Sequence, residues 1–238
     1  MRHAGPRKAD ETLSAREAIL RRLAAASTEA PLPAVYTRQP VGQAEAGPPP
    51  EDAAGRFAQR ARDVGAEVRR VTSSEVPAAV VDVVTTAGGH DVVVWLDPLL
   101  EEAGHALRRA GVSVFNDDGQ APDVAASAAF GLTTADYGIA ETGTLVLATG
   151  PGRSRGASLL PGHHIAVLPE DRISADLFTL MRELHVPLSS SLTFITGPSR
   201  TADIGLTPVR PAHGPMTVTI LLVSAVGLHP RSPAPDRQ

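Results

Sequence analysis

The residues best suited to chemistry lie in the stretch 131–147, GLTTADYGIAETGTLVL. Glu141 stands between an apolar run and a Thr-Gly-Thr turn that includes Thr142 and Gly143, and Asp136 precedes it. A carboxylate at the edge of a buried strand must be paired or hydrogen-bonded, and a glycine permits a positive φ or close backbone approach. Glu141 is therefore predicted to be a general base or an acyl-transfer nucleophile, or else a structural acceptor of backbone N–H groups. Asp136 is predicted to cap the following segment or to orient a ligand hydroxyl.

A second candidate segment is 196–204, TGPSRTADI, in which a Gly-Pro turn follows a predicted strand. Three donor side chains come directly after that turn: Ser199, Arg200 and Thr201. Such a loop is suited to a phosphate or a carboxylate, and Asp203 is included in the same predicted site. The alternative is that Arg200 pairs with Asp203 or with Glu141.

Histidines form the third group of candidates. His163 and His164 precede an apolar run, and His213 precedes the last one. Adjacent residues of a strand face opposite ways, so only one of the pair can point into a given site. His164 and His213 are predicted to reach the site. No metal is predicted, because a metal site needs further converging ligands. Arg153 and Arg155, in a Gly-rich loop, are read as a solvated loop in preference to an anion clamp.

The composition excludes several classes of protein. The 238 residues include no cysteine, so thiolate zinc sites, disulfides and Cys-ligated iron–sulfur clusters are excluded. Lys8 is the only lysine, which argues against phosphate-loop and Schiff-base chemistry. The net charge of −4 does not suggest nucleic-acid binding. No cofactor is predicted from the residues, and a redox role would require an organic cofactor or a partner. With neither a signal peptide nor a membrane span recognised, the protein is expected to be cytoplasmic.

Periodicity and turn residues predict alternating helices and strands. The predicted helices are 12–26, 51–64 (closed by Gly65), 75–86 (capped by Ser73 or Ser74), 98–110 (opened by Pro98), 122–129 and 174–184 (capped by Ser174). The predicted strands are 66–71, 91–97, 112–115, 164–168, 191–197 and 216–223. The Pro-rich segment 30–50 is expected to be an arm or a linker.

The order of these elements predicts a fold class. The β-α-β-α-β order of residues 66–115 indicates a parallel sheet with helices on both faces. In a doubly wound sheet, ligands bind at the carboxyl ends of the strands, and the loops after 147 and 197 are consistent with this position.

Taken together, these segments resemble a known family. The order IAETGTLVL, LLP-x-x-HIAV, GPSRTADI and then HGP is similar to the LUD domain of the lactate utilisation protein C (LutC, YkgG) family, over about residues 12–224. The resemblance implies an α/β fold of the NagB/RpiA/CoA-transferase-like type, with a doubly wound, mostly parallel sheet and a small antiparallel region. It divides the chain into an N-terminal helix and arm (1–50), a LUD-type domain (51–225) and a tail (226–238).

The resemblance also implies a function. The chain would be the non-cluster subunit of a system that oxidises L-lactate to pyruvate with iron–sulfur partner proteins, and it could form a homo-oligomer. The family motifs map onto a set that includes the candidates above: Glu141, Thr142, Gly143, Pro161, His164, Gly197, Pro198, Ser199, Arg200, Thr201, Asp203, His213 and Gly214. Two alternatives stay open: a stand-alone CoA-transferase-like or sugar-phosphate-isomerase-like enzyme that uses Glu141, and a regulatory module that binds a small carboxylate.

Overall fold

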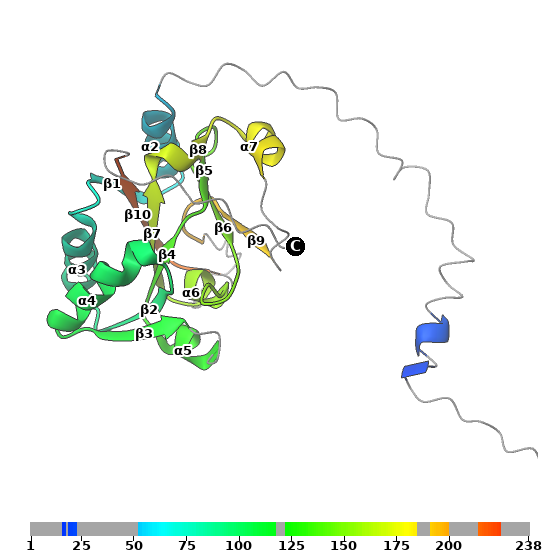
Figure 1. Ribbon diagram of the computed structural model, residues 1–238, viewed down its shortest axis with the longest axis horizontal. Coiled ribbons are helices and arrows are strands. Elements are labelled where there is room, and N and C mark those ends of the chain that lie inside the picture. Colours follow the sequence, from blue (N-terminus) through cyan, green and yellow to red (C-terminus); the bar gives the residue numbers. More distant parts are fainter. Residues whose placement is uncertain are drawn as a thin grey trace, which may run out of the picture. The chain divides into compact units, whose positions relative to one another are not determined.

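The computed structural model of the chain describes residues 16–17, 19–22, 52–117, 122–184, 191–199 and 214–224 (Figure 1). The chain divides into two units, Met1–Glu45 and Ala46–Gln238. In the first unit, residues 16–17 and 19–22 are helical, within the helix predicted over 12–26. The predicted arm 30–50 and the predicted tail 226–238 lie outside the described residues.

The second unit alternates helices and strands. The helices are α2 (Ala53–Asp63), α3 (Val76–Thr86), α4 (Glu101–Arg109), α5 (Pro122–Ser127), α6 (Gly156–Leu159) and α7 (Leu177–Glu183), with short 3-10 turns η2 (Pro98–Leu100) and η3 (Glu170–Arg172). The strands are β1 (Glu67–Val71), β2 (Asp91–Trp95), β3 (Ser113–Asp117), β4 (Phe130–Thr134), β5 (Tyr137–Ile139), β6 (Thr144–Ala148), β7 (His163–Pro169), β8 (Ile173–Ser174), β9 (Leu192–Ile195) and β10 (Thr217–Val223).

Six of the strands form a parallel sheet in the order β1-β10-β7-β4-β2-β3. Its central strands are mostly apolar, and the five residues of β4 and the last six of β7 and β10 are buried. Strands covered on both faces have this composition. The predicted α/β fold with a mostly parallel sheet is confirmed.

The remaining strands form a small mixed sheet in the order β8-β5-β6-β9. Strand β6 is antiparallel to both β5 and β9, whereas β5 and β8 are parallel. Helix α7 packs on this sheet through Leu180, which is buried against Ile139 and Val146. The small region therefore has an apolar cluster of its own.

The two faces of the large sheet are covered by different helices. Val94 faces a cavity beside α4, and its in-register partner on β4 is Leu132. The neighbouring residue of β4, Gly131, is overlaid by the backbone of α6 at Ala157. Because adjacent residues of a strand point to opposite faces, α4 and α6 lie on opposite sides of the sheet. Figure 1 shows the same division, with α3 and α4 on one side and α6 and the small sheet on the other.

This arrangement creates a switch point in the sheet. From β2 the chain crosses by α4 to β3, toward one edge of the sheet, whereas from β4 it continues to β7 and then β10, toward the other edge. Strands β2 and β4 are neighbours, so their carboxyl ends lead the chain in opposite directions. In open α/β sheets, this is the position at which ligands bind.

Two predicted helix caps were wrong. Helix α3 follows Glu75, whose carboxylate accepts from the backbone N–H and the hydroxyl of Thr72, and neither Ser73 nor Ser74 caps it. Helix α7 is capped by Asp176, which accepts from the backbone N–H of Thr179 at 2.7 Å, rather than by Ser174. In α7 a carboxylate took the place of the predicted hydroxyl, because it offers a stronger, charged acceptor to a free N–H group. In α3 no side chain of the described residues accepts from the first N–H groups of the helix.

Candidate functional site

The Thr-Gly-Thr turn joins β5 to β6 and packs on helix α2. Glu141 is exposed in this turn, and its backbone N–H donates to the carbonyl of Ala175 at 3.0 Å. Gly143 has a φ of +68°, and a Cβ there would lie 2.6 Å from the carbonyl carbon of Arg60. The glycine therefore permits close contact between the turn and α2. The Glu141 carboxylate is solvated and does not lie at a buried strand edge.

Hydroxyl groups connect this turn to the second predicted segment. Thr142 and Thr144 share a hydrogen bond of 2.6 Å between their hydroxyls, and Thr144 shares another of 2.8 Å with Thr196. A few residues on, the backbone N–H of Ser199 donates to the carbonyl of Pro215 at 2.8 Å. The structure thus joins the turn that follows Glu141 to the start of the 196–204 loop.

Asp136 lies at the other end of the β5–β6 hairpin, away from Glu141. Its carboxylate is buried, accepts from the backbone N–H of Ala148 at 2.7 Å and pairs with the Arg153 guanidinium at 2.8 Å. Arg153 also stacks on the indole of Trp95, 4.5 Å from the ring centroid. Asp136 therefore ties the end of β6 and the following loop to the end of β2.

This ion pair belongs to a polar network at the switch point. The hydroxyl of Thr134 donates to Asp97 Oδ2 at 2.7 Å and accepts from Arg153 Nη2 at 3.4 Å. Asp97 also accepts from the backbone N–H of Leu99 at 3.0 Å. The network connects the carboxyl ends of β2 and β4 through buried or half-buried groups, and its carboxylates hold their partners in a fixed geometry.

Sequence reasoning did not identify Trp95, Asp97 and Thr134 as site residues, and it read Arg153 as a solvated loop residue. One signal was present in the sequence. The only tryptophan ends an apolar strand and is followed within two residues by Asp97 and then Pro98. A polar residue directly after a buried parallel strand is placed at the edge where ligands bind.

His164 is fully buried in the large sheet and is separate from the Glu141 turn. Its Nε2 atom is 2.9 Å from the hydroxyl of Thr133, and its Nδ1 atom has no hydrogen-bond partner in the described part of the chain. Burial, together with the neighbouring His163, lowers the pKa of His164 from 6.5 to about 3. His164 is therefore neutral at physiological pH.

His163 points to the opposite face of the sheet, as expected for adjacent strand residues. It stacks on Phe130 with ring centroids 4.9 Å apart, and its Nε2 atom is 2.8 Å from the hydroxyl of Thr219. Burial lowers its pKa, which the charge of Glu67 partly offsets. Both histidines are held inside the sheet by threonine hydroxyls.

Four predicted site residues lie outside the described residues: Arg200, Thr201, Asp203 and His213. Of the predicted residues that are described, Thr142, Gly143 and Ser199 lie in the two segments joined by the hydroxyl chain, whereas Asp136 and His164 lie elsewhere. Within the described ranges, no three His, Asp or Glu side chains are arranged to hold a metal ion. Across those same residues, no helix is long and apolar enough to cross a membrane.

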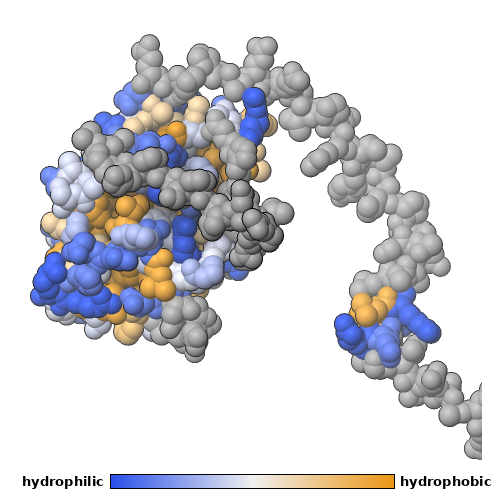
Figure 2. Space-filling view, in the orientation of Figure 1, coloured by the Kyte–Doolittle hydropathy of each residue, from blue (hydrophilic) through white to orange (hydrophobic). Residues whose placement is uncertain are grey.

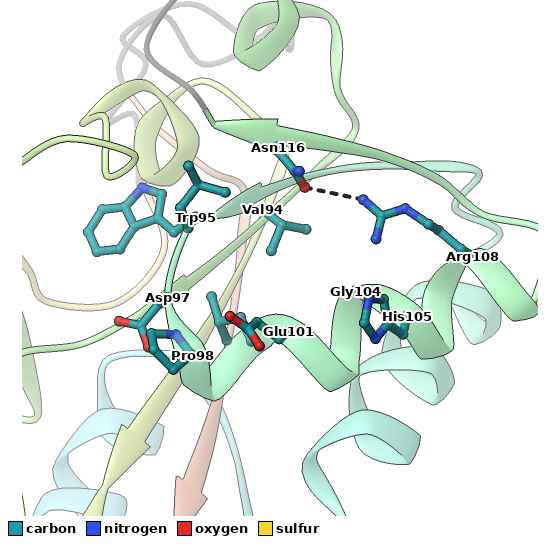
Figure 3. A pocket seen from close by; sticks show the side chains of 11 residues that line it. Val94, Trp95, Asp97, Pro98, Glu101, Gly104, His105, Arg108 and Asn116 are labelled. Atoms are coloured by element: carbon teal, nitrogen blue, oxygen red, sulfur yellow. Dashed lines mark hydrogen bonds between the residues drawn. The ribbon is translucent and has the colours of Figure 1, made fainter.

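A cavity of about 370 Å³ opens beside the switch point (Figure 3). Residues 94–98, which end β2 and begin η2, line one side of it, Asn116 of β3 lines another, and α4 covers it. The outward side of α4 is hydrophilic, seen in blue at the lower left of Figure 2. The side chains that line the cavity include the polar residues Asp97, Glu101, His105, Arg108 and Asn116.

Comparisons with known proteins identify the family of this chain. The family model described as the LUD domain matches residues 54–223. A protein named Lactate utilization protein C from Halalkalibacterium halodurans is 30% identical over 177 residues, which cover 70% of this chain and 77% of the relative. A protein of the same name from Geobacillus sp. (strain WCH70) is 34% identical over 169 residues, covering 64% and 70%.

A solved structure confirms the fold. The crystal structure of a DUF162 family protein from Deinococcus radiodurans superposes with a TM-score of 0.53 at 23% sequence identity. The superposition covers 72% of this chain and 96% of that one. At this identity the likeness concerns the fold alone.

Proposed function

The chain belongs to the LUD domain family, and we propose that it is the component without iron–sulfur clusters of an L-lactate utilisation system. In this proposal the system oxidises L-lactate to pyruvate. The observation that carries the proposal is the similarity to Lactate utilization protein C from H. halodurans, which covers 70% of the chain.

The absence of cysteine supports a division of labour between subunits. The oxidation of lactate to pyruvate releases two electrons and two protons, so an electron acceptor is required. A chain with no cysteine provides no thiolate for an iron–sulfur cluster. We therefore place the clusters on partner proteins, which receive the electrons.

The geometry of the Glu141 turn favours a contact role over a buried catalytic role. Glu141 is exposed, whereas ligand sites enclose most of the ligand in a concave, largely apolar pocket. The turn is nevertheless held firmly by α2 and by the Thr142–Thr144–Thr196 hydroxyl chain. We propose that this rigid, charged turn contacts an iron–sulfur partner, and that Ser199 and Arg200 hold a small carboxylate.

Growth on L-lactate tests the proposed function. A strain that lacks this chain should fail to grow on L-lactate as the only carbon source, and the wild-type gene should restore growth. Tagged protein purified from lactate-grown cells should carry iron–sulfur proteins with it. Normal growth of the deletion strain, together with purification free of such partners, would exclude the proposal.

A matched pair of variants tests the role of the turn. Glu141→Gln should weaken partner recovery and lactate growth, whereas Glu102→Gln, an exposed carboxylate on α4, should leave both unchanged. Both variants should unfold at the wild-type midpoint, because exposed substitutions of this kind change stability by less than about 0.5 kcal/mol. Equal growth and recovery for the two variants would remove Glu141 from the proposed interface.

A further inference from the structure

We propose that the cavity beside the switch point binds an elongated organic anion, with a carboxylate or phosphate at one end and hydroxyl groups at the other. The cavity measures about 370 Å³, within the range of roughly 300–1,000 Å³ that is typical of small-molecule sites. It lies at the carboxyl ends of β2 and β3, where doubly wound sheets bind ligands. This inference goes beyond the proposed function and does not depend on it.

One end of the cavity offers donors to an anion. Arg108 Nη2 donates to Asn116 Oδ1 at 3.2 Å (Figure 3). This bond uses one of five guanidinium N–H groups, and it orients the Asn116 amide so that its own N–H groups remain available. His105 projects from the same side of α4. A carboxylate or phosphate is the complementary ligand group.

The other end of the cavity offers acceptors. The Asp97 and Glu101 carboxylates lie there, apart from Arg108 in Figure 3. Asp97 is fixed by the N–H of Leu99 and the hydroxyl of Thr134, while Glu101 is exposed. Ionised carboxylates accept but do not donate hydrogen bonds, so the complementary ligand groups are hydroxyls.

The spacing of the two ends sets the length of the ligand. Glu101 and Arg108 are seven residues apart on α4, which corresponds to about 10 Å along the helix axis. L-lactate carries its carboxylate and hydroxyl on adjacent carbons and cannot reach both ends together. A polyhydroxylated anion with a chain of about six carbons spans most of this distance.

Gly104 supplies an independent indication of a ligand. It lines the cavity in the middle of α4, where glycine is less favourable than alanine. A Cβ at this position would meet only Arg108 Nη1, at 3.7 Å. By contrast, a Cβ at Gly131 or Gly143 would collide with backbone atoms. Packing therefore does not require the glycine at 104, and what it contributes is space in the cavity.

Trp95, the only tryptophan of the chain, belongs to the segment that lines the cavity. Its indole lies on the opposite side of β2 from Val94, donates a hydrogen bond to the carbonyl of Ser154 and is covered by Arg153, so it reports on the cavity wall. We would titrate the full-length protein with D-gluconate, D-glucose 6-phosphate, L-lactate and D-glucose, following Trp95 fluorescence and its indole N–H resonance. Gluconate or glucose 6-phosphate should give a saturable change, and the stronger of the two identifies carboxylate or phosphate. Lactate and neutral glucose should bind at least tenfold more weakly.

Substitutions on α4 test whether the anion binds in this cavity. Arg108→Gln and Gly104→Leu should each lower the affinity for the bound probe at least tenfold, the first by removing the cation and the second by filling the cavity. Arg109→Gln, on the same helix but outside the cavity lining, is the matched control and should bind as the wild type does. A denaturant midpoint measured for each variant verifies folding.

Three results would overturn this inference: no saturable change with either anion, lactate binding as tightly as the longer probes, or binding unaffected by both Arg108→Gln and Gly104→Leu. Because binding is measured on the isolated protein, these results are independent of growth on lactate. If the deletion strain failed to grow on L-lactate but the protein bound neither anion, the proposed function would stand and this inference would fail.

Discussion

The buried imidazole of His164 should make the protein sensitive to mild acid. Burial lowers its pKa from 6.5 to about 3, so the folded protein keeps His164 neutral in a pH range where the unfolded chain binds a proton. A depressed folded-state pKa makes the unfolded state the better proton acceptor between pH 6.5 and pH 3. Stability therefore falls as pH falls through that window.

The size of this effect follows from the shift. Each pH unit inside the window costs about 1.4 kcal/mol, so lowering the pH from 7 to 5 should remove about 2 kcal/mol of unfolding free energy through His164 alone. Small domains are stable by only about 5–15 kcal/mol. The loss is thus large enough to measure by urea unfolding at the two pH values, with Trp95 fluorescence as the probe.

His164→Gln isolates this contribution. Glutamine does not titrate and can still hydrogen-bond the hydroxyl of Thr133, so the variant should lose about 2 kcal/mol less than the wild type between pH 7 and pH 5. His90→Gln, at an exposed histidine, should follow the wild type. If the wild type and His164→Gln lost equal stability, the buried histidine would not be neutral in the folded state and the reasoning would be refuted.

Two further predictions concern the turn and the switch point. Gly143→Ala should destabilise the protein by at least about 2 kcal/mol in thermal unfolding, because it adds a collision with α2 to the cost of a positive φ. The control is Gly88→Ala, which has a φ of +70° but open space around its Cβ, and it should cost only about 1 kcal/mol. Equal losses of stability for the two variants would contradict the packing role of Gly143. Asp136→Asn should cost about 2–3 kcal/mol in urea unfolding, since it leaves the partly buried Arg153 charge unpaired. The control is Asp63→Asn, in an exposed pair, which should change stability by less than about 0.5 kcal/mol. Similar losses for the two variants would mean that the Arg153 pair is solvated.

Most of the fold could be predicted because its signals are local. The run 92–96 is apolar without interruption, and its first four residues lie in the buried strand β2. Gly65 and Gly111 were expected to end helices, and both have positive φ values just after α2 and α4. Each of these features depends on a few neighbouring residues, so no knowledge of distant contacts was needed.

The site was harder to predict because it depends on contacts between distant segments. Gly143 was predicted to permit either a positive φ or the close approach of a ligand. It has a φ of +68°, and the group that approaches it is the backbone of α2. Nothing in the turn itself indicates which helix packs there. Similarly, Arg153 was read as a loop residue exposed to solvent, although it stacks on Trp95, 58 residues earlier, and pairs with Asp136. The order of the strands in the sheet brings these groups together.

The two arginines near the switch point differ in what they can offer a ligand. Arg153 is already matched by the buried carboxylate of Asp136 at 2.8 Å, so an anion placed beside it would meet a neutral pair. Arg108 instead hydrogen-bonds the neutral amide of Asn116, which leaves its charge available. An anion that enters this edge of the sheet is therefore drawn to the α4 side of β2, while the Arg153 network keeps the wall of the cavity in place.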